Sequence, residues 1–206
     1  MTDNPILKLK LKSSIFDRDR EIIISSSQIE YDGNDRVGDD PTRFDKEDIK
    51  AFRFGIKWIR GIYFYIGRIY SIDIMDKEGR MIKIRLKSIY GIRKSLLHEK
   101  YGKLINALYR NFFDDISRSY LTKFQNNEEF ELGGLIFRDA GIAFDSKSQI
   151  IPWEFIGTRS YRSYYTIFPE SNPNSYKAFT YLDDWNAGIV YSVSRTILKD
   201  KGLLKG

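Results

Sequence analysis

One long helical pattern divides this chain, and the residues on both sides of it are patterned as strands. From Ser95 onwards apolar residues recur at spacings of three and four, which is typical of an amphipathic helix of roughly 25 residues. Ser95 is the expected N-cap, because its hydroxyl can accept a hydrogen bond from an amide of the first turn. The apolar positions are Leu97, Tyr101, Leu104, Ile105, Leu108, Phe112, Ile116 and Tyr120. A helix over about 95–121 that follows one group of strands and precedes another predicts two folded units.

Before this helix the chain alternates as strands do. Ile6 to Lys12 reads I-L-K-L-K-L-K, which places leucines on one face and lysines on the other. Further strands are expected at Glu21–Ser25 and Gln28–Asp32, followed by a loop over 33–41 that is rich in Gly, Asp, Asn and Pro. The stretch from Ile49 to Ile74 is dense in Ile, Phe, Tyr and Arg, and it predicts long strands.

Glycines and one hairpin signal predict where the chain bends and turns in this region. Gly55, Gly61 and Gly67 occur at six-residue spacing, which indicates bends or bulges in the long strands. Lys77-Glu78-Gly79 fits a three-residue hairpin loop with Gly79 in the left-handed conformation. The resulting register is Met75 with Met81, Ile74 with Ile82, Ile72 with Ile84, and Asp73 with Lys83.

Strand patterns resume after the helix. The expected strands are Phe130–Phe137, Gly141–Asp145, Ile150–Arg159, Tyr164–Phe168 and Lys177–Leu182. Residues 184–201 fit two interpretations, because their apolar residues alternate over 189–193 and also recur every four positions. Acidic residues at the start, Lys199 and Lys201 at the end, and then Gly202 favour a helix over about 184–201.

Two segments of the first half recur in the second. Ile29-Glu30-Tyr31-Asp32 matches Ile142-Ala143-Phe144-Asp145, and residues 44–49 match 151–156 with an acid and the final Ile in step. In both halves the matched segments are followed by further strands and a closing helix. This shared order predicts an internal repeat.

The chain resembles tandem bacterial pleckstrin-homology-like (PH-like) proteins, a group of uncharacterised function. The resemblance is carried by the Ile-aromatic-Asp turn, by Trp153-Glu154-Phe155-Ile156 and by Asp183–Asn186 before the last helix. It implies a mostly β (α+β) chain of two PH-like units, each a bent antiparallel sheet or partly open barrel capped by a C-terminal helix. The expected units are 1–122 and 123–206.

Composition excludes several kinds of chemistry. Cysteine is absent, so disulfides, thiolate nucleophiles, iron–sulfur clusters and Cys-ligated zinc are excluded. The single histidine, His98, would have to serve any Ser-His-Asp triad, and we interpret it instead as a solvated or capping residue of the helix. Nucleophile elbows, phosphate loops and spaced metal ligands are also absent from the sequence. We therefore expect no catalytic residue, no metal and no cofactor.

Positive charge is concentrated in the first part of the chain. The net charge is +6, and residues 50–110 hold fifteen Lys and Arg against four acidic residues. Such a segment can attract phosphate-bearing partners, and the alternative is a solvated sheet face. Lys83, Arg85 and Lys87 form one cationic row; reversing their charge should abolish binding of an anionic ligand without unfolding the chain. This row could instead be the wet side of a half-buried strand.

Two further groups are candidate binding residues. Phosphoinositide-binding PH domains carry a Lys and, after a spacer, basic-x-Arg around the first hairpin, and Lys10, Arg18 and Arg20 fit that spacing. Separately, Trp58, Arg60, Phe64 and Arg68 would share one strand face, as in stacking platforms for single-stranded nucleic acid. The alternative for this second group is a buried aromatic sheet face with arginines at the strand edges.

These features predict a non-catalytic binding or adaptor protein that acts through PH-like surfaces. The alternative is a peripheral binder of anionic lipid or nucleic acid that uses the basic face of unit one. A protein partner or an anionic ligand is expected. The longest run without charge lies between Asp184 and Arg195, about half of what a membrane-spanning helix needs, and the first residues lack a secretory pattern. A cytoplasmic location is therefore expected.

Overall fold

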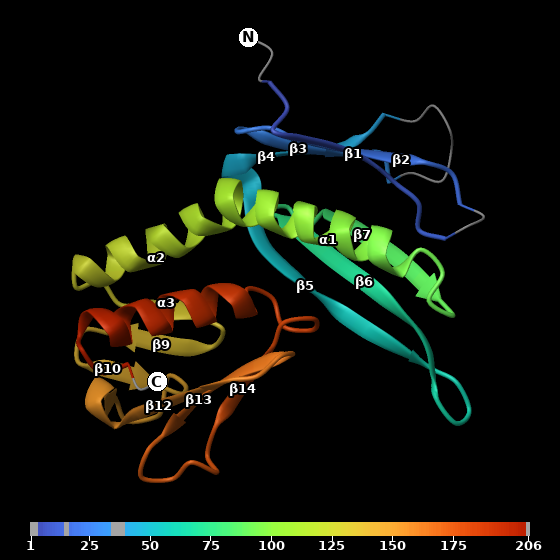
Figure 1. Ribbon diagram of the computed structural model, residues 1–206. Helices are drawn as coiled ribbons and strands as arrows, with labels where there is room; N and C mark the ends of the chain where they lie inside the picture. Colours follow the sequence, from blue (N-terminus) through green and yellow to red (C-terminus); the bar gives the residue numbers. More distant parts are fainter. Residues whose placement is uncertain (1–3, 15–16, 34–39, 205–206) are drawn as a thin grey trace. The chain divides into compact units, whose positions relative to one another are not determined.

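Two antiparallel sheets and one helix make up the first of the two units into which the chain divides (Figure 1). The computed structural model describes residues 4–14, 17–33 and 40–204, so most of the predicted loop over 33–41 lies outside the described residues. The elements of this unit are β1 (Leu7–Leu11), β2 (Arg20–Ile24), β3 (Gln28–Tyr31), β4 (Thr42–Asp45), a 3-10 turn (Lys46–Asp48), β5 (Ile49–Arg60), β6 (Tyr65–Asp76), β7 (Met81–Ile89) and α1 (Lys94–Leu108). Strands β1–β4 form one sheet and β5–β7 the other, each in chain order.

The second unit repeats this order with shorter strands. Its elements are α2 (Asp114–Gln125), β8 (Phe130–Leu132), β9 (Leu135–Arg138), β10 (Gly141–Ala143), β11 (Ile151–Pro152), a 3-10 turn (Trp153–Phe155), β12 (Ile156–Ser160), β13 (Tyr164–Pro169), β14 (Lys177–Thr180) and α3 (Ala187–Asp200). Again a four-stranded sheet is followed by a three-stranded sheet and a helix. The described residues are thus mostly β, in open antiparallel sheets.

The matched sequence segments occupy corresponding places in the two units. Residues 29–31 lie in β3 and 142–143 in β10, each the third strand of its sheet. The 3-10 turns 46–48 and 153–155 also correspond, and each is followed directly by an Ile that begins the next strand. The matched segments therefore lie at corresponding elements of the two units, although β10 ends one matched residue earlier than β3.

Each unit has its own core. In unit one the inward side chains of the strands, such as Ile22, Ile72 and Ile74, are buried together with Leu97 and Leu104 of α1. In unit two Tyr165 and Ile167 of β13 are buried, as are Ile189, Val193 and Ile197 of α3. Burial of each such side chain contributes about 1.5–3 kcal/mol relative to exposure, so the alternation read from the sequence is what holds these sheets against their helices.

The predicted hairpin is confirmed in every pair. Strands β6 and β7 pair Met75 with Met81, Ile74 with Ile82, Ile72 with Ile84 and Asp73 with Lys83. Gly79 has a φ of 83°, as the three-residue loop requires.

The helical predictions hold with corrections at the ends. Ser95 is not the N-cap: Arg93 occupies that position with a φ of 57°, and α1 begins at Lys94. The predicted helix over 95–121 is interrupted by a π-helical turn, Tyr109–Phe113, and the two units divide inside this turn, after Phe112, rather than after residue 122. Residues 184–201 do form a helix, α3, which begins at Ala187.

Two predicted strands are wrong because tight turns interrupt them. Residues 130–137 form β8 and β9, joined at Gly133 and Gly134, which both have a positive φ. Residues 150–159 are divided by the 3-10 turn Trp153–Phe155. Of the three glycines expected at bends, Gly61 lies at a hairpin turn beside a bulge at Ile59/Arg60, whereas Gly55 pairs regularly with Ser71.

Candidate functional site

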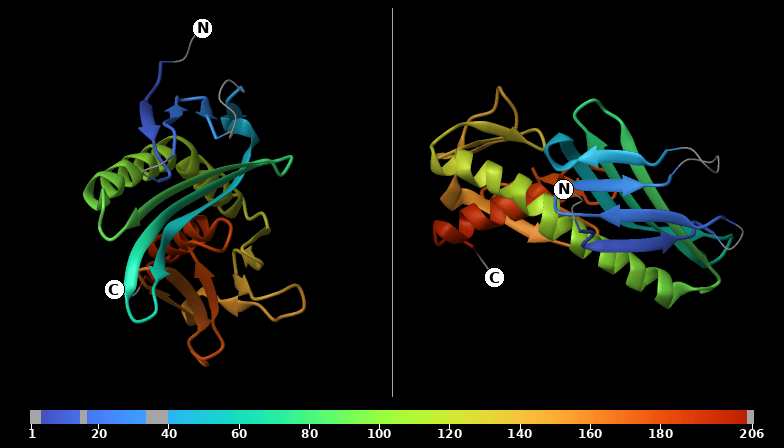
Figure 2. Two further views of the ribbon diagram at one scale, coloured as in Figure 1. Left: turned by 90° about the vertical axis from the view of Figure 1, so that its right-hand side faces the viewer. Right: turned by 90° about the horizontal axis from the view of Figure 1, so that it is seen from above.

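The end of the β5–β6 hairpin exposes four large apolar side chains in a row. We call residues Gly61–Tyr65 the hairpin tip. The exposed fractions of Ile62, Tyr63, Phe64 and Tyr65 are 85%, 92%, 64% and 64%. The last pair between β6 and β7 joins Gly67 to Ile89, so the tip extends beyond the end of β7 (Figures 1 and 2). Exposed apolar groups of this size in a turn, where polar residues are usual, indicate an interaction surface.

Local geometry explains why the chain turns here. The amide of Gly61 donates to the carbonyl of Phe64 at 2.7 Å, which closes the turn. A Cβ on Gly61 would lie 2.8 Å from the Ile66 side chain, so this position is kept free of a side chain. The turn therefore leaves the intervening side chains without neighbours to cover them.

Directly behind the tip, the Trp58 indole lies close to both Arg68 and the tilted ring of Tyr65, the last residue of the tip. Trp58 and Arg68 are partners in the β5–β6 ladder, and the Arg68 guanidinium lies 4.3 Å from the indole centroid. The Tyr65 ring lies 5.6 Å from the same indole. The structure thus brings together two of the predicted stacking residues.

Of the other two, one lies directly before the tip and one within it. Arg60 is exposed at the end of β5, opposite Tyr65, and Phe64 is part of the turn. The interpretation of these aromatics as a buried sheet face is wrong, because Trp58 is 45% exposed and Phe64 is 64% exposed.

Sequence reasoning missed a second apolar group beside the tip. Ile89 at the end of β7, and Tyr90 and Ile92 in the connection to α1, are exposed to 40%, 73% and 48%. The amide of Tyr90 donates to the carbonyl of Ile66 at 2.7 Å, which ties this connection to the base of the tip. The helical period only begins after these residues, so no periodic signal marked them.

The two chain segments that carry these apolar groups contain charge of one sign. The sequence holds no Asp or Glu from Ile49 to Ile72, nor from Gly79 to His98. Lys57 and Arg60 are exposed on β5, and Arg93 and Lys94 begin α1 beside the second apolar group. These two segments are therefore both apolar and cationic.

The predicted cationic row of β7 is divided by an ion pair. Arg85 Nη1 lies 2.6 Å from Oδ1 of Asp73, whose other oxygen accepts from Arg53 Nε at 3.0 Å. The Asp73 side chain is only 4% exposed, so this pair is part of the fold. Lys83 and Lys87 remain exposed on either side. Charge reversal at Arg85 would place a second negative charge beside the buried Asp73 carboxylate, which the sequence did not reveal.

The first-hairpin arginines are also engaged with carboxylates. Arg18 forms two hydrogen bonds to Asp32, at 2.5 and 2.6 Å, and these lower the pKa of that carboxyl. Arg20 lies 3.3 Å from Asp17 and donates to the carbonyl of Gly33 at 2.7 Å. Lys10 is exposed. A phosphate at Arg18 and Arg20 would have to displace these internal partners.

The single histidine lies near an aromatic ring, and the described acidic residues do not gather into a metal-binding group. His98 is exposed on α1, and its ring lies 5.9 Å from that of Tyr70. Among residues 4–14, 17–33 and 40–204, no group of three or more His, Asp or Glu side chains is placed to hold a metal ion.

Comparison of the chain with protein-family models, with curated proteins and with solved structures found no match. None of the helices in the described ranges combines the length and the apolar character that crossing a bilayer requires.

Proposed function

We propose that the chain is a non-catalytic binding protein of two PH-like units, and that unit one attaches reversibly to an anionic lipid bilayer through the hairpin tip. The common order of a four-stranded sheet, a three-stranded sheet and a helix supports the PH-like assignment. The observation that carries the function is the exposure of Ile62, Tyr63, Phe64 and Tyr65 on a turn whose flanking strands, over residues 49–72, contain Lys and Arg but no Asp or Glu.

The energies of this arrangement suit reversible attachment. Fully burying one large apolar side chain contributes about 1.5–3 kcal/mol, and partial insertion of the tip gives a fraction of that for each residue. Each Lys or Arg near an anionic surface adds about 1 kcal/mol. Trp and Tyr favour the boundary between headgroups and acyl chains, which suits Trp58 and Tyr65 at the base of the tip. Together these contributions support binding that salt can weaken.

A single-stranded nucleic acid is the second candidate ligand, because the Trp58–Arg68 stack resembles a base-stacking platform. The lipid surface accounts for more of the site. Ile62, Ile89 and Ile92 are aliphatic and have no ring face on which a base could stack, whereas all three can enter an acyl layer. A protein partner is the third possibility, and the experiment below separates all three.

The test is cosedimentation of the full chain with vesicles of phosphatidylcholine alone or mixed with phosphatidylserine. We expect binding to the mixed vesicles that weakens steeply as salt rises. The double variant Ile62→Ser and Phe64→Ser should bind at least about 10-fold more weakly, because it removes apolar area worth about 1.4 kcal/mol or more from the bilayer. Met81→Ser is the matched control, since Met81 is an exposed apolar residue (42%) at the other end of the same sheet.

Three results would contradict the proposal. These are no binding to either vesicle at low salt, equal loss in the control and tip variants, or tighter binding to a single-stranded oligonucleotide that the tip variant abolishes. The last outcome would favour the nucleic-acid function. Binding to neither lipid nor oligonucleotide would favour a protein partner.

A further inference from the structure

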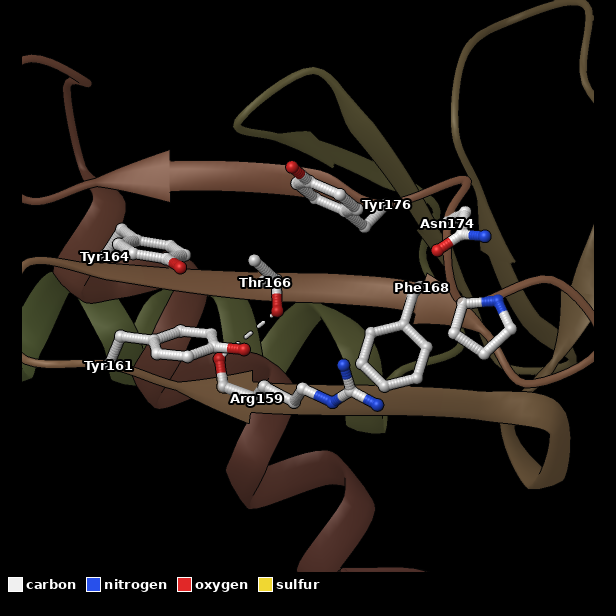
Figure 3. A pocket seen from close by; sticks show the side chains of 8 residues that line it. Arg159, Tyr161, Tyr164, Thr166, Phe168, Asn174 and Tyr176 are labelled. Carbon is white, nitrogen blue, oxygen red and sulfur yellow. Dashed lines mark hydrogen bonds between the residues drawn. The ribbon is translucent and has the colours of Figure 1, made fainter.

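A shallow hollow lies on the outer face of the three-stranded sheet of unit two (Figure 3). Side chains alternate along β13: Tyr165 and Ile167 are buried on the inner side, where the Tyr165 hydroxyl lies 2.9 Å from Oγ of Ser194 in α3. Thr166 and Phe168 therefore belong to the opposite face, and they form the floor of the hollow. Its volume is about 160 Å³, smaller than the hundreds of Å³ typical of drug-sized ligands.

The walls of the hollow carry many hydrogen-bonding groups. Tyr161 and Tyr164 stack on each other with ring centroids 4.3 Å apart, so each fixes the orientation of the other. Figure 3 shows these two rings on one side of Thr166, with Tyr176 above and Asn174 beyond Phe168. The lining residues thus include four hydroxyls, from three tyrosines and Thr166, and the carboxamide of Asn174. They surround a space large enough for one small ring.

The one charged group of the hollow is a guanidinium. The Arg159 guanidinium lies 4.9 Å from the centroid of the Phe168 ring, which holds the side chain across the floor. No carboxylate is among the residues that line the hollow, and within the described ranges Arg159 has no ion pair with an acidic residue. This separates Arg159 from Arg18, Arg80 and Arg85, whose guanidiniums are paired with aspartates.

We propose that this hollow binds one pyranose ring that carries a carboxylate, as a uronic acid does. A planar guanidinium can donate two parallel hydrogen bonds to one carboxylate. A phosphate monoester carries about −1.5 to −2 charges at pH 7, and the hollow supplies no second cation for it. The single positive charge therefore matches a monoanion.

The neutral groups select a hydroxylated ring over a flat aromatic acid. Sugar hydroxyls both donate and accept, so they can replace the waters on Tyr161, Tyr164, Tyr176 and Asn174. An aromatic acid would displace these waters without reproducing their hydrogen bonds, which loses affinity. The apolar C–H faces of the pyranose would pack against the tyrosine rings. This site lies in unit two and does not depend on the lipid attachment proposed for unit one.

The test is an NMR titration of the ¹⁵N-labelled full chain with D-glucuronate, D-glucose and benzoate. We expect glucuronate to shift amide signals of β12, β13 and the loop before β14, with a dissociation constant on the order of 1 mM. Glucose should bind at least about 10-fold more weakly, because it offers no carboxylate to Arg159. Benzoate should bind more weakly than glucuronate.

Two arginines of the same hairpin give a matched pair of variants. Arg159→Gln should weaken glucuronate binding at least about 10-fold, whereas Arg162→Gln should leave it unchanged, because Arg162 is exposed in the turn and does not line the hollow. Tyr176→Ala is a second variant at an exposed position, and it should weaken glucose and glucuronate alike. Arg159→Gln and Tyr176→Ala should both bind vesicles like the parent chain.

The inference would be overturned by any of three results. One is the absence of shifts with glucuronate at about ten times the expected dissociation constant. Another is benzoate binding as tightly as glucuronate. The third is equal affinity of the Arg159→Gln and Arg162→Gln chains. Loss of vesicle binding in the tip variant with glucuronate binding intact would concern only the function of unit one.

Discussion

At the scale of single residues, β6 shows how a sheet strand accommodates buried charge. Asp73 lies between Arg53 and Arg85, and Asp76 at the strand end is fully buried and accepts from the amide and Nε of Arg80, at 2.7 and 2.6 Å. Arg80 also lies 5.5 Å from the Phe44 ring centroid. These carboxylates are therefore parts of the fold of unit one and are not available to ligands.

Asp76 should make the stability of unit one sensitive to acid. Burial raises its pKa, but the hydrogen bonds from the Arg80 side chain and amide more than offset this and leave the pKa below its ordinary value of 3.8. A lowered folded-state pKa means that the stabilisation is complete above the ordinary value and is lost as pH falls through the folded value. The difference in unfolding free energy between the parent chain and Asp76→Asn should be largest near pH 7 and should shrink below about pH 4.

Urea unfolding followed by circular dichroism at several pH values measures that difference. Glu47→Gln, at an exposed position of the 3-10 turn, is the control and should change little across the range. A difference between the parent chain and Asp76→Asn that stays constant with pH would contradict the role given to the Asp76 carboxylate.

Side-chain pairing was harder to predict than strand register. The sequence predicted Asp73 opposite Lys83, and the backbone register is correct, but the carboxylate pairs with arginines on both flanking strands. Which of several cations reaches a buried acid depends on the twist of three strands, and a two-strand pattern does not contain this information. Likewise, alternation put Trp58 on one face of a strand without showing that its side chain is 45% exposed.

At the scale of elements, the π-helical turn Tyr109–Phe113 lets one helical run serve two cores. Phe112 and Phe113 are adjacent within this turn, on either side of the division between the units, and both are buried. Before the turn Leu104 and Leu108 are buried in unit one. After it Tyr120 packs against Phe130 and Phe124 against Trp153 of unit two. The uninterrupted apolar spacing of the sequence concealed this change of phase.

Removing one residue from this turn should change the phase between the buried face of α1 and the buried face of α2. Deletion of Asn111 restores an α-helical count and rotates all later positions by about 100° relative to α1. We expect a loss of about 3 kcal/mol or more in unfolding free energy, comparable to removing a buried aromatic side chain. The point variant Asn111→Ala should cost only about 1 kcal/mol, for the hydrogen bond that its amide donates to the Ala107 carbonyl at 2.7 Å. Thermal and urea unfolding measure both, and a deletion no more harmful than the point variant would contradict this explanation.

At the scale of the whole molecule, the order of the helices and strands was easier to predict from the sequence than the residues at which they and the two units begin and end. The matched segments 44–49 and 151–156 each contain a 3-10 turn followed by the first residue of a strand. The sequence match thus pointed to equivalent positions in the two units, although it did not predict the turns themselves. Short strands such as β11 gave no periodic signal of their own, because two residues cannot show alternation. The unit boundary lies inside a helix, where composition does not change, so a division after the helix was the natural expectation.

The candidate sites depended on exposure, which the sequence does not record. Arg18, Arg20 and Arg85 fit simple spacing rules for ligand-binding cations, but each forms an ion pair with an aspartate. By contrast, the sequence of the hairpin tip fits the pattern of a buried strand end, but its side chains are exposed in the structure. Only the three-dimensional arrangement separates a cation that stabilises the fold from one that faces solvent.

Insertion of the hairpin tip into an anionic bilayer is the central claim, and the absence of cysteine allows it to be measured at a single residue. Tyr63→Cys, at a position 92% exposed, would carry an environment-sensitive fluorophore at the tip, and Glu78→Cys would carry it on the exposed β6–β7 loop as the control. With phosphatidylserine-containing vesicles, the label at position 63 should shift to the blue and brighten, and high salt should reverse the change, while the label at 78 should stay as in water. An unchanged spectrum at 63, or equal changes at both positions, would contradict the claim.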